Sequence, residues 1–179
     1  MNFTAIDFET ANYYRHSACA VGLVRVEAGR IVEKKACLIR PPDRWFKFTH
    51  IHGITWEQVK DAPTFRQIWP EIEPMIRQAD FLAAHNASFD RSVLMRTCEH
   101  YGIAPPPVEF RCTVKLAREV FGIYPTRLPD VCRRLNIRLD AHHHALADAL
   151  ACARIVLHAA ESAPDALQPS SCRKRKGQP

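Results

Sequence analysis

The sequence contains no Cys-x-x-Cys pair, and its seven cysteines are scattered along all 179 residues. An odd number of unpaired cysteines argues against a disulfide framework and against a cysteine zinc site, and it fits a reduced, cytoplasmic environment. No apolar run approaches the ~18 residues that a membrane-spanning helix needs. The first predicted strand begins at residue 2 or 3, which leaves no room for a signal peptide. We therefore expect a cytoplasmic protein that makes no use of a membrane.

A strong charge of one sign is also missing from most of the chain. The formal net charge is +6, but residues 164–179 hold four bases and only one acid. Without that segment the net charge is +3, which permits a nucleic-acid partner without demanding one. The length indicates one domain. We expect that domain over residues 1–163 and a basic, disordered tail over residues 164–179.

Apolar and β-branched runs predict an antiparallel hairpin near the amino end. A first strand ends at residue 10, and two further strands are expected at residues 18–26 and 30–39 with a short turn between them. Residues 43–63 have the composition of a long loop with an aromatic cluster. Loops of this length without regular structure often carry function.

Alternating helices and strands are expected after this loop. Apolar residues at helical spacing follow Thr64, but Pro70 and Pro74 predict a kink or two short helices. The remaining predicted elements are a buried strand at 81–84, a helix at 88–101, a strand at 108–111, a helix that Thr113 caps and that ends near Gly122, a helix at 128–135, and a last helix with an apolar stripe of Leu146, Leu150, Ala153 and Leu157. This order predicts an α/β fold with a mixed five-stranded sheet flanked by helices.

Two carboxylates stand one residue apart at the end of the first predicted strand, in Asp7-Phe8-Glu9. Because side chains alternate along a strand, Asp7 and Glu9 should point to the same side. Adjacent carboxylates repel each other unless a cation lies between them, and hard oxygen ligands suit Mg²⁺ or Mn²⁺. For this motif alone, a charged strand end that faces water is an equally good interpretation.

Two further acids stand near the starts of predicted helices. Asp90 falls in a first helical turn, where the helix dipole stabilises an anion, and it also follows a strand end, where α/β sheets place ligand groups. Asp148 follows the run His142–His144 and lies among alanines and leucines, where an unpaired charge would be costly. The histidine run leaves a zinc site open as an alternative, although the cysteines supply no further ligands.

The sequence does not decide which histidine accompanies Asp148. His144 is four residues before it, about 40° away around a helix, whereas His143 is five residues before it and about 140° away. Helical periodicity therefore favours His144. If the helix begins only after the histidines, periodicity says nothing about His143.

Three short motifs together resemble those of the DEDD exonuclease superfamily, in its histidine-containing branch: Asp7-x-Glu9, Asp90 and His143-x-x-x-x-Asp148. Two connecting segments resemble this family as well, namely His52-Gly53-Ile54-Thr55 and Pro63-Thr64-Phe65. The resemblance covers roughly residues 2–160 and extends to the group of the proofreading epsilon subunit of bacterial DNA polymerase III and its stand-alone homologues.

The resemblance implies a ribonuclease-H-like fold and a metal-dependent 3′–5′ exonuclease. It implies two Mg²⁺ or Mn²⁺ ions held by Asp7, Glu9, Asp90 and Asp148, with His143 as the general base and His142 or His144 as alternatives. It also implies substrate contacts at Thr10, Ile51, His52, Asn86 and Phe89. For Phe89, a place in the core is an equally good interpretation, since buried Phe is common.

The expected substrate is the 3′ end of single-stranded or frayed DNA, with RNA as the nearest alternative and with a polymerase or repair protein as a further partner. The competing function is a non-catalytic module that binds nucleic-acid ends or assists a polymerase. The presence of all five motif residues counts against that function, because a binding module has no need of four converging carboxylates.

Overall fold

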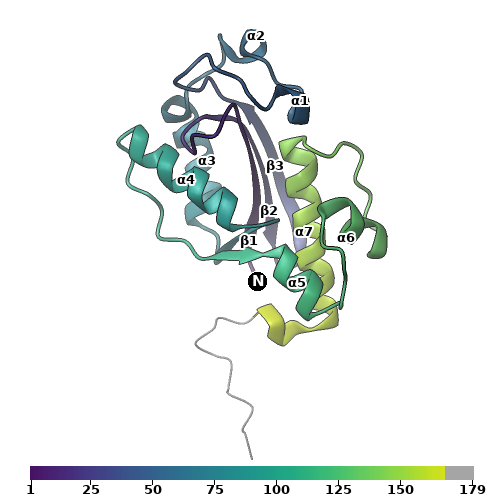
Figure 1. Ribbon diagram of the computed structural model, residues 1–179. Helices are drawn as coiled ribbons and strands as arrows, with labels where there is room; N and C mark the ends of the chain where they lie inside the picture. Colours follow the sequence, from purple (N-terminus) through teal and green to yellow (C-terminus); the bar gives the residue numbers. More distant parts are fainter. Residues whose placement is uncertain (168–179) are drawn as a thin grey trace, which may run out of the picture.

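A mixed five-stranded sheet forms the centre of the computed structural model, which describes residues 1–167 (Figure 1). The strands lie in the order β3-β2-β1-β4-β5. Neighbours are antiparallel among β1 (Phe3–Thr10), β2 (Ala18–Glu27) and β3 (Arg30–Leu38). β4 (Phe81–Ala84) pairs in parallel with β1, and β5 (Phe110–Cys112) pairs in parallel with β4. The predicted mixed sheet with an amino-terminal hairpin is confirmed.

Helices cover both faces of this sheet (Figure 1). One face carries α7 (Ala145–Ser162), flanked by α5 (Thr113–Glu119) and α6 (Leu128–Arg134). The opposite face carries α3 (Phe65–Arg77) and α4 (Ser88–His100). Each face has its own apolar core, because alternate residues of β1 point to opposite sides. Phe3 and Ala5 pack on the α7 side, and Ile6 and Phe8 pack on the α3 side.

The segment 43–63, expected to be one long loop, contains two single-turn helices. These are α1 (Thr49–His52) and α2 (Trp56–Val59). The start of α2 is fixed by a capping box in which the Thr55 backbone N–H donates to Gln58 Oε1 over 2.8 Å. A helix of one turn is too short to show an apolar period, so the sequence prediction missed both.

α3 is one continuous helix through Pro70 and Pro74, so the predicted alternative of two short helices was wrong. Both prolines are exposed, so the carbonyl groups that lose a helical N–H partner lie where water can reach them. The opposite side of the helix is held against the sheet by six buried residues: Phe65, Ile68, Trp69, Ile72, Met75 and Ile76. Burial of this face outweighs the unfavourable prolines.

Smaller corrections concern the later elements. β5 begins at Phe110 rather than at residue 108, and Thr113 is the first residue of α5 rather than its cap. In α7 the predicted leucine stripe is only half-buried, at Leu146, Leu150 and Leu157. The fully buried side of α7 consists mainly of small residues, which allow the helix to approach the sheet closely: Ala149, Ala151, Cys152, Ala153 and Ala159.

The end of the described chain is ordered beyond the expected domain boundary. Pro164–Leu167, assigned from the sequence to a disordered tail, form a 3-10 helix in which Leu167 is buried against the core. Residues 168–179, with the four bases of the predicted tail, lie outside the described residues. The six cysteines within residues 1–167 are free thiols. No helix in that range is long and apolar enough to cross a membrane.

Candidate active site

Three acidic side chains meet where β1 ends and α7 begins. Asp7 and Glu9 point to the α7 side of the sheet, as strand alternation predicts, and Asp148 joins them from the first turn of α7. Carboxylate oxygens of these three residues all lie within 4.8 Å of one another. The structure therefore brings together three of the four acids predicted from the sequence.

A glycine on the neighbouring strand makes this meeting possible. Gly22 pairs directly with Asp7 across β1 and β2, and directly paired residues point to the same face. A Cβ atom at Gly22 would lie 2.3 Å from both the carbonyl carbon and the carbonyl oxygen of Ala145. Because Gly22 has no side chain, the start of α7 can pack directly against β2. This packing positions Asp148, in the first turn of α7, close to Asp7.

Asp90 reaches the same region from α4, on the other side of the sheet. β4 pairs with β1 only along residues 3–5, so the backbone of β1 has no strand neighbour on that side farther along. The Phe8 N–H there donates to Asp90 Oδ1 over 2.9 Å. Asp90 is buried and acts as a hydrogen-bond partner for β1, adjacent to the three-acid cluster rather than within it.

Negative charge is crowded at this site. Burial raises the pKa of Asp7 well above its ordinary value, and the nearby carboxylates of Asp90, Asp148 and Glu9 raise it further. Burial raises the pKa of Glu9 to about 8, with Asp148 and Asp90 contributing in the same direction. A cation would relieve this repulsion, and hard carboxylate oxygens are the ligands that Mg²⁺ and Mn²⁺ prefer. The residues therefore fit a divalent ion.

The three histidines precede α7, which begins at Ala145. Helical periodicity therefore does not apply to His143, and the argument for His144 from the sequence fails. His143 has a positive φ of 66°, and its backbone N–H donates to Asp148 Oδ2 over 3.0 Å. Nδ1 of His142 lies 3.0 Å from the same oxygen. The structure thus ties Asp148 to two histidines, one through its backbone and one through its ring.

The rings of His142 and His143 stack with their centroids 3.8 Å apart. His142 and His143 line the cleft that contains the acids, whereas His144 lines only the neighbouring hollow beside β2 and β3, which His143 also borders. Burial lowers the pKa of His143, and His142 lowers it further, against the opposing effect of Asp148. His143 is therefore neutral near pH 7 and able to accept a proton.

The cleft has a volume of about 470 Å³. Four of the five predicted substrate contacts line it: Thr10, Ile51, His52 and Phe89. The Ile54 N–H donates to Nδ1 of His52 over 3.0 Å, so Nε2 carries the proton and donates to the Thr10 carbonyl at 3.2 Å. Asn86 is exposed at the start of α4 and does not line the cleft, so its contact with substrate stays a prediction.

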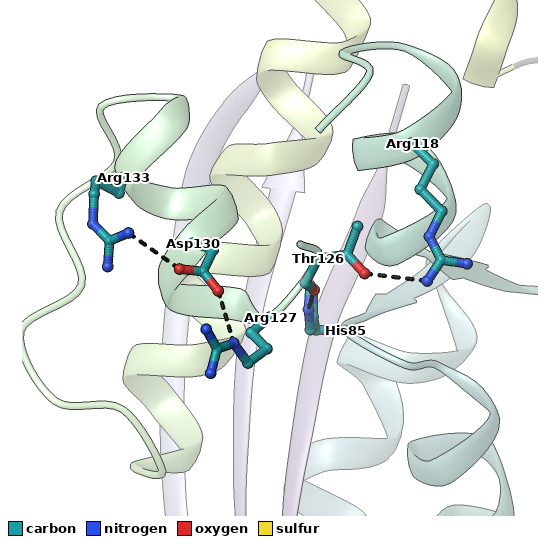
Figure 2. Close-up of polar contacts among 6 residues, drawn as sticks. All are labelled: His85, Arg118, Thr126, Arg127, Asp130 and Arg133. Carbon is teal, nitrogen blue, oxygen red and sulfur yellow. Dashed lines mark hydrogen bonds and ion pairs between the residues drawn. The ribbon is translucent and has the colours of Figure 1, made fainter. Parts of the chain in front are cut away.

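His85 lines the cleft but was not among the residues selected from the sequence. Its Nε2 lies 2.8 Å from the Thr126 carbonyl oxygen, as Figure 2 shows, and its Nδ1 lies 2.8 Å from Thr113 Oγ1. Because a carbonyl only accepts, Nε2 is the donor and Nδ1 accepts from the hydroxyl. Arg118 donates to the Thr126 hydroxyl over 3.2 Å. These bonds attach the chain before α6 to the end of β4.

Arg127 also lines the cleft, from the residue just before α6. Its Nε lies 2.8 Å from Asp130 Oδ2, and Arg133 Nη1 lies 3.1 Å from the other oxygen of the same carboxylate (Figure 2). The hydrogen bond from Arg127 is the main cause that lowers the pKa of Asp130. The cleft therefore has a cation at its rim. In the sequence, nothing distinguishes this arginine from the other 24 lysines and arginines.

Comparison with known proteins agrees with this arrangement of acids and histidines. The profile of the family described as Exonuclease (RNase_T) matches residues 4–156. The chain belongs to this exonuclease family. The match covers β1 through most of α7 and so includes all five residues of the acid and histidine motifs. The resemblance inferred from the sequence is confirmed.

Two curated relatives come from bacterial replication. A DNA polymerase III PolC-type protein of Clostridium perfringens is 28% identical over 160 residues, which is 86% of this chain but 11% of the relative. DNA polymerase III subunit epsilon of Aquifex aeolicus is 28% identical over 162 residues, covering 87% of this chain and 78% of the subunit. The exonuclease chain thus spans about a tenth of the PolC-type relative and most of the epsilon subunit.

A solved structure gives the same fold. Exonuclease X in complex with 5′ overhanging duplex DNA superposes with a TM-score of 0.75 and 26% sequence identity, over 90% of this chain and 93% of that one. The predicted α/β fold of the ribonuclease-H-like type is confirmed.

Proposed function

We propose that this chain is a metal-dependent 3′–5′ exonuclease that removes nucleotides from single-stranded or frayed DNA ends. The observation that carries the proposal is the cluster of Asp7, Glu9 and Asp148, whose carboxylate oxygens lie within 4.8 Å of one another in an open cleft. Similarity to the epsilon subunit and to a DNA-bound Exonuclease X supports DNA as the substrate.

Asp7, Glu9 and Asp148 would hold divalent ions, and Asp90 would complete the set for two ions per site, Mg²⁺ or Mn²⁺. When bound, such ions lower the pKa of water and neutralise the charge that develops on a phosphodiester. The zinc alternative has one observation in its favour, because His142, His143 and Asp148 also place ligand atoms within 4.8 Å of one another. Asp148 belongs to both groups, so the two sites would share this ligand.

His143 would take the proton from the attacking water. His143 lines the cleft, its pKa is lowered, and its ring has no hydrogen-bond partner among residues 1–167, so a ring nitrogen is available. General base catalysis of this kind contributes about 10²–10⁴-fold in rate. His142 would instead orient the carboxylate of Asp148, to which its ring is hydrogen-bonded.

The terminal nucleotide would lie against Thr10, Ile51, His52 and Phe89. Ile51 and Phe89 supply apolar surface for the base. The ring of His52 fixes the backbone at Thr10 through its hydrogen bond to the Thr10 carbonyl. Arg127, which also lines the cleft, would contact a phosphate. Asn86 remains a candidate at the start of α4.

RNA remains the alternative substrate, because the carboxylates do not distinguish the two sugars. A polymerase or repair partner and a cytoplasmic location also remain predictions. The non-catalytic end-binding module is the alternative function, and a nuclease assay separates it from the enzyme.

The test is digestion of 3′- and 5′-labelled single-stranded DNA and RNA of one sequence, in Mg²⁺, Mn²⁺, Zn²⁺ or EDTA. We expect stepwise shortening of DNA from the 3′ end, lost in EDTA and in Asp7→Asn. The exposed Asp61→Asn is the matched control and should keep full activity. Activity in EDTA, or shortening from the 5′ end, would contradict the proposal. Activity with Zn²⁺ alone would favour the histidine site.

A further inference from the structure

Four aromatic side chains form a continuous surface beside the cleft: Tyr13, Tyr14, Trp45 and Phe48. Three of them are well exposed, Tyr13 at 64%, Tyr14 at 56% and Trp45 at 48%. The ring of Tyr13 lies 5.0 Å from that of Phe48 and 6.1 Å from that of Trp45, and Tyr14 lies 6.2 Å from Trp45. Phe48 also lines the cleft, so this aromatic platform begins where the cleft ends.

The platform is built on braced backbone rather than on loose loops. The Lys47 N–H donates to the Ala11 carbonyl over 2.7 Å, and the buried Asn12 side chain donates to the Trp45 carbonyl over 2.9 Å. Asn12 Oδ1 in turn accepts from the Tyr14 N–H at 2.9 Å. These bonds join the connection after β1 to the segment before α1, and Figure 1 shows α1 and the start of α7 near the same end of the sheet. The backbone that carries the exposed rings is thus braced before any partner binds.

Positive charge accompanies these rings. The two segments, residues 11–17 and 43–48, contain Arg15, Arg44 and Lys47 against the single acid Asp43. The guanidinium of Arg15 lies 4.5 Å from the centre of the Phe89 ring, which lines the cleft. Exposed aromatic side chains together with basic side chains are typical of proteins that bind single-stranded nucleic acid. The rings stack on nucleobases, and the cations bind phosphates.

We propose that the rings of the aromatic platform stack on unpaired nucleobases of the strand that leads into the cleft. The basic side chains Arg15, Arg44 and Lys47 would contact the phosphates of that strand. This inference rests on the proposed function, because the cleft would hold the 3′-terminal nucleotide and the platform would hold those that precede it. An exposed apolar surface continuous with the cleft is explained by a ligand that occupies both. The ligand class is a single-stranded polynucleotide.

The test measures binding in EDTA, where the proposed hydrolysis is blocked, by fluorescence anisotropy of 5′-labelled oligothymidylate of twelve residues. A second oligonucleotide carries abasic residues at all positions but the last two. We expect the wild-type protein to bind the abasic strand about tenfold more weakly, and Tyr13→Ala and Trp45→Ala to bind full oligothymidylate more weakly by a similar factor. Both variants should bind the two strands with nearly equal affinity.

Tyr124→Ala is the matched control, because Tyr124 is 63% exposed but contacts Arg118 instead of the platform. It should bind as the wild type does, and thermal unfolding should show all variants folded. Equal wild-type affinity for the abasic strand would overturn the proposal, as would a Tyr13→Ala variant that binds normally. Stronger binding to a blunt duplex than to the single strand would overturn it as well.

A nuclease assay on the same variants separates this inference from the proposed function. If the enzyme digests DNA but Tyr13→Ala digests two-residue and twelve-residue strands as the wild type does, the platform is wrong and the exonuclease stands. If no digestion occurs but the abasic strand still binds more weakly, the exonuclease is wrong and the platform stands.

Discussion

The backbone of Ala145 lies directly against Gly22, where even a single added methyl group would come within 2.3 Å of its carbonyl carbon. Gly22 is the partner of Asp7 in the β1–β2 pair, and Ala145 begins the helix that carries Asp148. The contact between these two residues therefore sets how far the third motif lies from the first. A substitution at Gly22 should act on the site without changing any residue in it.

We expect Gly22→Ala to lower both stability and activity. The added Cβ would meet rigid backbone, so α7 must shift, at a cost of about 1–3 kcal/mol of unfolding free energy. Asp148 would move away from Asp7, and activity should fall more than stability alone explains. Urea unfolding and exonuclease rates below the unfolding transition measure the two effects.

Gly29→Ala is the control for this experiment. Gly29 has a positive φ of 80° but no neighbour within 4 Å of an added Cβ, so it tests backbone strain alone. We expect a loss of about 1–2 kcal/mol with unchanged activity per folded molecule. Equal loss of activity in both variants would contradict the role given to Gly22.

The crowded carboxylates predict an unusual pH dependence of stability in metal-free protein. Glu9 has its pKa raised to about 8 from an ordinary 4.5, and the pKa values of Asp7 and Asp90 are raised in the same direction. The folded state therefore holds protons that the unfolded state releases. Stability from these groups is present at low pH and is lost as pH rises from about 4.5 to 8.

A divalent ion should reverse this loss, because it stabilises the ionised carboxylates. We expect Mg²⁺ or Mn²⁺ to raise the melting temperature more at pH 8.5 than at pH 5.5, measured against EDTA at each pH. Asp7→Asn should raise the melting temperature of metal-free protein at pH 8.5 and weaken the response to the ions. An ion effect that is equal at both pH values would count against the site.

The sequence predicts the parts of this site that depend on local order, and misses those that depend on contacts across the fold. Strand alternation is enough to place Asp7 and Glu9 on one side, and Asp148 stands out as an acid on an apolar helix. The bond from Phe8 to Asp90 joins residues 82 positions apart, so no local pattern shows it. No local sequence pattern shows that His85 and Arg127 line the cleft either.

The histidine question shows the limit most clearly. Periodicity favours His144 only if the helix includes it, and the first residue of α7 is the least predictable feature of that helix. The structure starts the helix at Ala145, so His143 lies before the helix, in a left-handed conformation, and lines the cleft. α1 and α2 were missed for a related reason, because one turn carries no readable period.

Substitution of each histidine in turn tests their separate roles. His143→Ala should lower kcat by about 10²–10⁴-fold with little change in oligonucleotide affinity, because it removes the proton acceptor. His142→Ala should cause a smaller loss, since Asp148 keeps its bond from the His143 backbone. His144→Ala should be nearly normal, because that residue lies outside the cleft. Single-turnover rates and binding in EDTA separate these effects, and a loss confined to His144→Ala would show that the base is misassigned.

Arg127 and Arg133 offer a matched pair for the rim of the cleft. Both bind the Asp130 carboxylate, as Figure 2 shows, but of the two only Arg127 lines the cleft. Because the proposed contact is with phosphate, Arg127→Ala should raise KM for single-stranded DNA about fivefold to tenfold with little change in kcat. Loss of one phosphate contact should also reduce the slope of log KM against log salt concentration by about 0.7. Arg133→Ala should match the wild type in both measurements, and an equal effect of the two substitutions would mean that Asp130, rather than the cation at the rim, governs binding.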